Sequence, residues 1–160
     1  MANDGTIRRA RATDVSRLVD LSEEKRLQYQ AYQPLFWRKA PDSREKQLPY
    51  FERLLSDDRV IALVHERDDA IDGFVVATLL NAPPVYDPGG LTCLIDDFVA
   101  ADERWDTVGA ALLAAVDREA KHRGAVQMVV VCGHLDQRKR RMLADGAFTI
   151  ASEWYVKSIE

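Results

Sequence analysis

The segment DERWDTVGAALL, residues 102–113, combines residue types that can hold a phosphate. Arg104 comes early in it, Gly109 follows, and an apolar run typical of a helix begins there. The first backbone N–H groups of a helix have no intrahelical partner and, together with the helix dipole, attract anions. A glycine lets the backbone come close to a phosphate, and an arginine adds charge-assisted contacts. Gly109 is the only glycine of the segment, so a simple strand-to-helix junction remains the alternative.

Two neighbouring acids, Asp96 and Asp97, stand inside the apolar run LTCLIDDFVA, residues 91–100. A buried carboxylate is costly unless it is hydrogen-bonded or protonated, so the pair needs an explanation. Neighbouring side chains of a strand point to opposite faces, so we expect at most one of them to face a pocket. Burial would raise its pKa toward that of a useful general base. The alternative is a helix cap and a pair with an arginine, and a strand bulge would decide which acid faces the pocket.

Histidine and cysteine offer fewer candidates. His134, in VCGHLD, follows an apolar strand, and an imidazole with a pKa of about 6.5 suits proton transfer. The alternative for His134 is a turn histidine bonded to a backbone carbonyl. Cys132 is expected to be a small buried side chain. The three histidines are dispersed and show no metal-ligand spacing, so no metal site is predicted.

The elements that position these residues follow a regular order along the chain. Periodicity and turn residues predict strands over residues 6–12, 59–66, 71–80, 91–100, 125–132 and 148–159. Helices are expected over residues 13–32, 42–55, 107–124 and 136–147. The order is β-α-α-β-β-β-α-β-α-β, in which an antiparallel meander meets one right-handed parallel unit. We therefore predict a single α/β domain over residues 1–160, with a mixed sheet and helices on both of its faces.

Length and composition fit an ordinary single domain. The chain has 160 residues, of which 47% are hydrophobic and 30% charged, and its net charge is −4. The acidic balance argues against a nucleic-acid partner, and the lack of a run of about 18 apolar residues argues against a membrane span. Two cysteines cannot form a disulfide framework, and the N-terminal residues lack the apolar core of a signal peptide. We expect a cytoplasmic protein without a nucleic-acid or membrane partner.

The loop quoted first resembles that of the GNAT superfamily of acyl-CoA-dependent N-acetyltransferases. The family's loop reads Gln/Arg-x-x-Gly-x-Gly/Ala, and Arg104 and Gly109 match its first and last positions. Val99 supplies the hydrophobic strand residue that the family places five positions before the arginine. Thr107 stands where the family has another glycine, so the turn must form there without a positive φ, or with strain.

A second signature follows the next expected strand. Asp136 and Phe148 have the twelve-residue spacing of the family's polar residue and the Phe of its Gly-Phe pair, with Ala147 in place of the glycine. The position that often holds a general-acid tyrosine, five before Phe148, is Leu143, which cannot protonate a thiolate. The element order agrees over residues 6–159. The resemblance therefore implies the GNAT fold, with acetyl-CoA as co-substrate.

The resemblance also implies where acetyl-CoA would bind. The backbone amides of residues 108–110 would hold the pyrophosphate, and the strand backbone of residues 98–99 would hold the pantetheine arm. The acetyl group would lie where strands 92–100 and 125–132 part. The basic run 138–141 would lie near the nucleotide, with a solvated helix face as the alternative. The expected cofactor-binding residues are Phe98, Val99, Arg104, Trp105, Asp106, Thr107, Val108, Gly109, Ala110, Asp136, Arg138 and Lys139.

Expectations about catalysis and the acceptor follow from the same resemblance. Some GNAT members, among them polyamine-acetylating enzymes, carry acids in the strand that here holds Asp96 and Asp97. In this fold the segment in and after the first helix roofs the acceptor pocket. Its aromatic side chains could pack on an apolar or cationic acceptor, with core packing as the alternative. The substrate-binding candidates are Tyr29, Tyr32 and Trp37, with Tyr86 at the rim, and the catalytic candidates are Asp96, Asp97 and His134.

The function expected is transfer of an acetyl group from acetyl-CoA to a primary amine of a small molecule, by direct attack. The alternative is a GNAT-fold module that binds CoA or another small ligand without turnover, which Leu143 and Thr107 favour. The paired acids favour the enzyme. No metal is expected, and a homodimer remains open.

Overall fold

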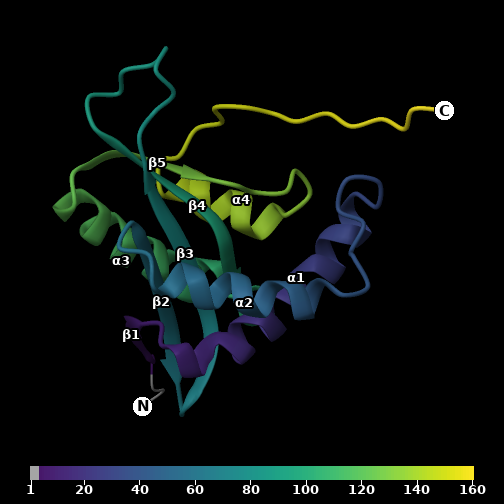
Figure 1. Ribbon diagram of the computed structural model, residues 1–160, viewed down its shortest axis with the longest axis horizontal. Helices are drawn as coiled ribbons and strands as arrows, with labels where there is room; N and C mark the ends of the chain where they lie inside the picture. The colour runs from purple at the N-terminus through teal and green to yellow at the C-terminus, as the bar shows by residue number, and fades with distance from the viewer. Residues whose placement is uncertain (1–3) are drawn as a thin grey trace.

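A mixed β-sheet forms the centre of the computed structural model, which describes residues 4–160 (Figure 1). Within these residues the strand order is β1-β2-β3-β4-β5, and β5 is parallel to β4 while the other neighbours are antiparallel. The strands are β1 (Thr6–Arg9), β2 (Val60–Arg67), β3 (Ala70–Leu80), β4 (Leu91–Ala100) and β5 (Ala125–Val130). The α-helices are α1 (Val15–Tyr32), α2 (Ser43–Leu55), α3 (Ala110–His122) and α4 (Gln137–Asp145). The predicted mixed sheet is confirmed.

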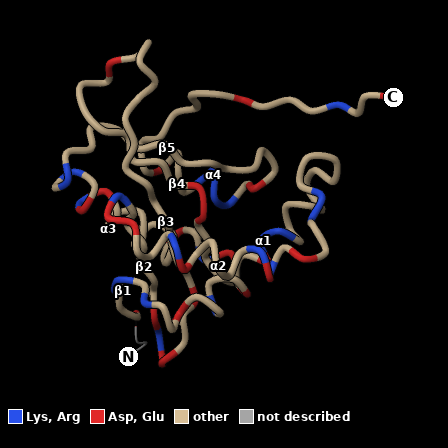
Figure 2. The backbone as a smooth tube through the Cα atoms, viewed as in Figure 1, with Lys and Arg blue, Asp and Glu red and all other residues tan. Residues whose placement is uncertain are grey.

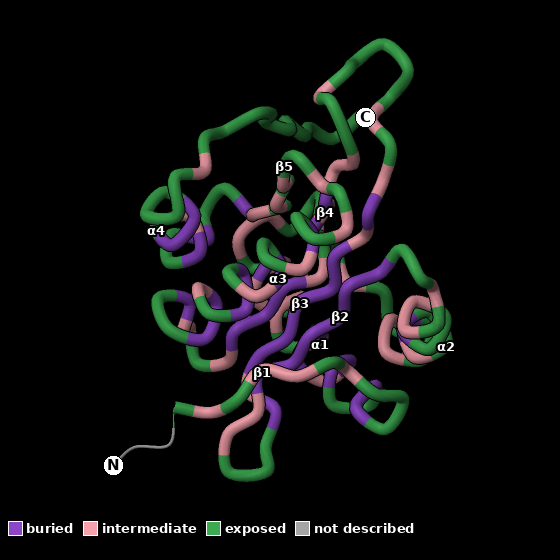
Figure 3. The backbone as a smooth tube through the Cα atoms, turned by 90° about the vertical axis from the view of Figure 1, so that its left-hand side faces the viewer, coloured by how far each residue is buried: buried purple, intermediate pink, exposed green. Residues whose placement is uncertain are grey.

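Helices cover both faces of the sheet because its central strands present apolar side chains to both sides. In β3, Val75, Ala77 and Leu79 join a core that includes residues of α3 and α4. Phe74 and Val76 instead belong to a second core, with residues of α1 and α2. Charged residues lie mainly on the helices and turns, and β3 is nearly free of them (Figure 2). The central strands β2 and β3 are correspondingly buried along most of their length (Figure 3).

The expected last strand, residues 148–159, is not part of the sheet in the single chain. After α4 the chain runs extended across the molecule, away from β5, and is yellow in Figure 1. Its residue types favour a strand, but a strand also needs a neighbour to pair with its backbone N–H and C=O groups. The element order is therefore the predicted one as far as α4, and an extended C-terminal tail, residues 149–160, follows it.

A residue in the left-handed conformation ends α4. The Phe148 amide donates to the Leu143 carbonyl (3.0 Å) and the Ala147 amide donates to the Ala144 carbonyl (3.0 Å), which together form a Schellman motif. Ala147 has a φ of 65° at the position where such motifs usually have glycine. This conformation explains why the GNAT family has a glycine before the phenylalanine. In this chain Ala147 adopts the same conformation and is strained.

Replacing Ala147 with glycine should raise the free energy of unfolding by about 0.5–1 kcal/mol, because glycine adopts a positive φ without the Cβ clash. Ala144→Gly, inside α4, is the matched control and should lower it by about 1 kcal/mol through the poor helix propensity of glycine. Urea denaturation measures both changes. An Ala147→Gly variant as unstable as Ala144→Gly would contradict the strained cap.

Candidate functional site

The parallel strands β4 and β5 pair over only part of their length. Their last register pair is Ile95 opposite Val130, and the next bond joins the Val131 amide to the Ile95 carbonyl (3.0 Å). Beyond this point β4 continues against β3, whereas β5 has ended. The strands therefore part after Ile95, which is where the sequence resemblance puts the acetyl group.

A β-bulge lies at the same place. In the register with β3, Ile95 and Asp97 have consecutive partners, so the residue between them, Asp96, is left over. An extra residue of this kind interrupts the alternation of side chains along a strand. Ile95 and Phe98 accordingly enter the same core, on the side of α3 and α4, although they are three positions apart.

The bulge brings both aspartates toward the layer of α1 and α2, so the expectation that they point to opposite faces is wrong. Burial lowers the pKa of Lys25, on α1, and the charges of Asp97 and Asp96 both oppose that change. Burial raises the pKa of Tyr50, on α2, and the same two carboxylates raise it further. Asp97 is half-buried at this position, and Asp96 is exposed.

Of the two aspartates, Asp97 has the more buried carboxyl. Burial raises the pKa of its carboxyl, and the Lys25 ammonium offsets part of that rise. A raised pKa makes a carboxylate a stronger proton acceptor. The ammonium of Lys25 also lies 5.1 Å from the centroid of the Tyr29 ring. Sequence reasoning missed Lys25, and its i, i+4 spacing to Tyr29 within an otherwise solvated run was the available signal.

Tyr29 closes the site on the side of α1. Its buried hydroxyl donates to Asp136 Oδ2 (2.7 Å) and accepts from the Gly133 amide (3.2 Å), and burial raises its pKa. The Trp37 ring packs on it with 4.7 Å between the ring centroids. Asp136 also caps α4, because Oδ1 accepts from the Lys139 amide (3.4 Å). Tyr29 and Asp136, expected to contact the acceptor and the cofactor, are thus bonded to each other.

The other predicted side chains lie in more open positions. His134 is exposed in the turn before α4, and its carbonyl accepts from the Arg140 guanidinium (3.0 Å). Tyr86 is 71% exposed on the loop that projects beyond β3 and β4 (Figure 1). Tyr32 is half-buried, and its hydroxyl accepts from the Gln28 amide group (2.8 Å). The position of His134 fits the alternative interpretation of a turn histidine.

Lys139 occupies the point where β4 and β5 part. Its side chain is fully buried, and Nζ donates to the Val131 carbonyl (2.8 Å). Nζ also lies 5.3 Å from the Phe98 ring and 5.1 Å from the Trp105 ring. Burial lowers the pKa of Lys139 to about 7. Lys139 therefore does not face solvent as the expected phosphate contact would, because it shares the inward face of α4 with Leu143, one turn later.

The predicted anion-binding turn is already helical before α3 begins. Residues Trp105–Gly109 form a π-helical turn that leads directly into α3. The Gly109 amide donates to the Arg104 carbonyl (3.1 Å), and the Ala110 amide donates to carbonyls within the turn. Those two amides are engaged in the helix, which corrects their expected role at the pyrophosphate. The donors that a helix leaves unpaired lie one turn earlier, in residues 105–108.

Gly109 serves side-chain packing rather than the approach of a phosphate. Its φ is −61°, an ordinary helical value, but a Cβ there would lie 2.7 Å from the buried Trp105 ring. The positive φ values of this loop fall instead on Asp102 (53°) and Glu103 (58°). Thr107, where the resembled family has a glycine, lies within the π-helical turn and needs no positive φ.

Arg104 points to the β2–β3 hairpin. Its guanidinium donates to Asp72 of β3 (2.8 Å), and the other oxygen of that carboxylate contacts the His65 ring (2.5 Å). This ion pair accounts for an arginine at this position without a ligand. The expected contact between Arg104 and a phosphate therefore has no support from its position.

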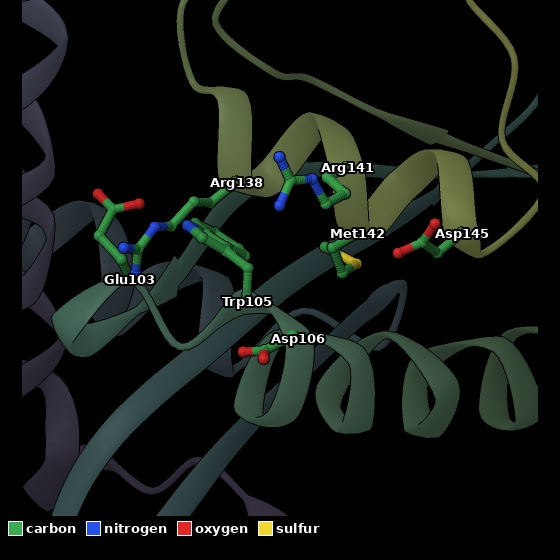
Figure 4. Close-up of a pocket in the computed structure, with 7 residues that line it drawn as sticks. All are labelled: Glu103, Trp105, Asp106, Arg138, Arg141, Met142 and Asp145. Carbon is green, nitrogen blue, oxygen red and sulfur yellow. The ribbon is translucent and has the colours of Figure 1, made fainter.

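A pocket of about 280 Å³ lies between the π-helical turn and α4 (Figure 4). Arg138 and Arg141 both extend from α4 at this pocket. Arg138 was among the predicted residues, and the structure adds Arg141 from the same basic run. Two guanidiniums and the first amides of a helix are a donor set that fits a diphosphate. The lining residues are Glu103, Trp105, Asp106, Arg138, Arg141, Met142 and Asp145.

Residues 4–160 contain no helix long and apolar enough to cross a bilayer. In that same part of the chain, no three His, Cys, Asp or Glu side chains gather as metal ligands would. Cys93 and Cys132 are both free thiols.

Solved structures share this fold over nearly the whole chain. A predicted acetyltransferase from Clostridium acetobutylicum, solved with acetyl-CoA, has a TM-score of 0.74 at 19% identity, covering 96% of this chain and 95% of that one. The aminoglycoside N-acetyltransferase AAC(6′)-Iy, solved with CoA, has a TM-score of 0.73 at 16% identity, covering 96% and 93%. A mutant of the BH1408 protein from Bacillus halodurans reaches 0.85 at 14% identity, covering 97% and 99%. No family profile and no curated protein matches the sequence, so it is these likenesses that establish the fold, which is that of the GNAT acetyltransferases, as predicted.

Gly109→Ala should lower the free energy of unfolding by about 1–3 kcal/mol, because the new Cβ would displace the buried Trp105 ring. Gly146→Ala is the matched control: its Cβ would come no closer than 3.4 Å to other atoms. We expect that variant to stay within about 0.5 kcal/mol of the parent. Urea denaturation followed by far-ultraviolet circular dichroism compares the two. Equal stability of both variants would show that Gly109 is not held by Trp105.

Proposed function

We propose that the chain is an acetyl-CoA-dependent N-acetyltransferase that acts on a primary amine of a small molecule. The observation that carries the proposal is Asp97, a half-buried carboxyl with a raised pKa at the bulge where β4 and β5 part. An ammonium group cannot attack a thioester until it loses a proton, so an amine acceptor requires a base at this point. The likeness to acetyltransferases solved with acetyl-CoA or CoA supports the choice of co-substrate.

Acetyl-CoA would supply the acetyl thioester, and its diphosphate fits the donor set next to α4. The amides of residues 105–108 and the guanidiniums of Arg138 and Arg141 would hold that group. The backbone of β4 beyond Ile95, no longer paired with β5, is available to the pantetheine arm at residues 98–99, as the sequence resemblance implies. The thioester would then lie beside the bulge and the two aspartates.

Asp97 would take the proton of the acceptor ammonium, and the freed amine would attack the thioester carbonyl carbon. The bulge keeps the Asp96 backbone out of the pairing with β3, so its amide can donate to the carbonyl oxygen as negative charge develops there. The Lys25 ammonium favours the ionised form of Asp97 between turnovers. When the carbon–sulfur bond breaks, the sulfur leaves as a thiolate and needs a proton.

Lys139 would protonate the leaving thiolate. Leu143, at the position where the resembled family often has a tyrosine, is buried and carries no proton to donate. Lys139 lies one turn before it, with Nζ at the parting of the strands. An ammonium with a pKa of about 7 is a sufficient acid for a thiolate, since the reference thiol of cysteine has a pKa of about 8.5.

A module that binds CoA or another ligand without turnover is the second candidate. Its support is the pocket beside α4, whose two arginines, Arg138 and Arg141, can hold an anionic ligand whether or not a reaction follows. A buried Leu143 in place of a tyrosine points the same way. Tight binding of acetyl-CoA with no thiol release for any amine would favour this candidate over the enzyme.

Asp97→Asn should lower turnover about 10²–10⁴-fold, the usual effect of losing a general base, with little change in affinity for acetyl-CoA. Asp96→Asn is the matched control and should lose far less, because Asp96 is proposed to act through its backbone amide. The base must be ionised, so the wild-type rate should rise with pH through the raised pKa of Asp97. That limb should be absent from the profile of Asp97→Asn. Thiol release with a panel of small primary amines measures the rates, and equal turnover of the wild type and Asp97→Asn would remove Asp97 as the base.

Lys139→Met should slow turnover and flatten the dependence of stability on pH. Burial places the pKa of Lys139 at about 7 in the folded chain, below its unfolded value of about 10.4. The unfolded chain therefore binds more protons between these values, and wild-type stability should rise with pH from about 7 to about 10. Below about pH 7 the wild type bears the full penalty of the buried charge, so Lys139→Met should be the more stable chain there.

Arg138→Met is the control for that variant, since it removes a charge from the neighbouring pocket and should keep the pH slope of the wild type. Urea denaturation at several pH values measures the slope, and thiol release measures turnover. A Lys139→Met chain with an unchanged slope would show that the lysine is not buried as an ammonium. A flattened slope with full turnover would remove Lys139 as the proton donor.

A further inference from the structure

The ammonium of Lys25, on α1, is half-buried and has no anionic partner. Within residues 4–160 its Nζ forms no hydrogen bond or ion pair, and it faces the Tyr29 ring, 5.1 Å from the centroid. The carboxylate of Glu23, one turn away on the same helix, is already engaged by Arg26 (2.9 Å) and Lys39 (2.7 Å). An ammonium that leaves water without a counter-charge is unfavourable, so an anionic group is expected to bind beside Lys25.

Asp97 is an unpaired charge of the opposite sign on β4. In the part of the chain that the structure describes, its half-buried carboxylate accepts no hydrogen bond and forms no ion pair. The two groups are nevertheless close, because the charge of Lys25 lowers the pKa of Asp97 and the charge of Asp97 raises the pKa of Lys25. Opposite charges that are close, half-buried and not in contact leave space for a ligand that carries both signs.

The two charges border the point where β4 and β5 part. Asp97 follows the bulge, beyond the last register pair of the two strands at Ile95. Lys25 lies one helical turn before Tyr29, whose hydroxyl accepts from the Gly133 amide (3.2 Å) just after β5. The acceptor amine proposed above would approach the thioester at this point, so it would meet the carboxylate of β4 and the ammonium of α1 together.

We propose that the acceptor is an α-amino acid, whose ammonium group meets Asp97 and whose carboxylate binds the ammonium of Lys25. This inference rests on the acetyl transfer proposed above and names the class of its acceptor. In an α-amino acid both charged groups are attached to one carbon atom, so a small molecule can satisfy both side chains with charge-assisted hydrogen bonds. A simple amine would leave Lys25 unpaired, and a diamine would bring a second positive charge toward it.

The products of this reaction are the N-acetyl amino acid and CoA. Asp97 takes one proton of the ammonium, and the lone pair of the nitrogen then forms the bond to the acetyl carbonyl carbon. The carbon–sulfur bond breaks with its electron pair on sulfur, and the thiolate takes up a proton. The nitrogen loses its second proton to solvent as the amide forms. Because the amide is neutral, the product keeps only its carboxylate and is repelled by Asp97 once that group is ionised again, which favours release.

The test compares acceptors that differ only in the carboxylate: L-leucine with 3-methylbutylamine, and L-phenylalanine with 2-phenylethylamine. Thiol release gives kcat/KM for each, and Lys25→Met should lower it about 10–100-fold more for the amino acids than for the amines. The same acceptors are used with every chain, so their different basicities cancel in this ratio. Arg26→Met is the matched control: its charge also lowers the pKa of Asp97, but it is paired with Glu23, so the ratio should stay that of the wild type.

An equal loss for amino acids and amines in Lys25→Met would overturn the α-amino acid as acceptor and leave the acetyl transfer standing, because Lys25 would then act only through the pKa of Asp97. Faster turnover of 1,4-diaminobutane than of either amino acid would overturn it as well. Cooperative thermal unfolding shows whether Lys25→Met is folded, and Lys25→Gln takes its place if it is not.

Calorimetry separates the failure of this inference from the failure of the proposed acetyl transfer. L-leucine should bind to the wild type saturated with CoA, and the binding should be lost in Lys25→Met and kept in Arg26→Met. If no amine is turned over, the acetyl transfer is wrong, and this binding pattern alone would support an amino-acid site at Lys25. Absence of leucine binding together with absence of turnover would overturn both.

Discussion

The backbone that follows β5 no longer pairs with β4, so its N–H and C=O groups need other hydrogen-bond partners. The arrangement of the site depends on the side chains that supply them. The Val131 amide makes the last bond to β4, at the Ile95 carbonyl. Side chains satisfy the next groups: Lys139 donates to the Val131 carbonyl, and the Gly133 amide donates to the Tyr29 hydroxyl. Leaving the buried Gly133 amide unpaired would cost about 1–3 kcal/mol. The same two bonds hold α4 and α1 at the point where the strands part. The gap between β4 and β5 and the helices that border it therefore depend on the same hydrogen bonds.

This arrangement gathers opposite charges where water is scarce. Burial lowers the pKa of both Lys25 and Lys139, the charge of Lys25 lowers that of Lys139 further, and the carboxylates of β4 oppose these effects. Aromatic faces replace part of the lost hydration, with Tyr29 beside one ammonium and Trp105 beside the other. The ionisation of Asp97 therefore depends on both lysines.

The sequence predicted what local periodicity determines and missed what depends on distant contacts. Alternating apolar residues were sufficient for the mixed sheet and for the element order as far as α4. The bulge at Asp96 could not be located from the sequence, because one extra residue hardly changes the composition or the length of a strand. Lys139 was misjudged because a run of four basic residues outweighed its helical spacing to Leu143. Position 109 requires a glycine because the Trp105 ring leaves no room for a Cβ, and this contact exists only in the folded chain. Residues 148–159 have the propensity of a strand, but propensity cannot supply the strand's neighbour.

The three tryptophans of the chain lie in three different environments and so give it built-in optical reporters. Trp105 is 5% exposed and lines the pocket beside α4, with the Lys139 ammonium 5.1 Å from its ring. Trp37 is half-buried against Tyr29, and Trp154 is in solvent on the tail. The polarity around an indole sets the wavelength of its emission. In variants that keep one tryptophan each, the emission wavelength therefore reports separately on the pocket, the layer of α1 and the tail, without an added label.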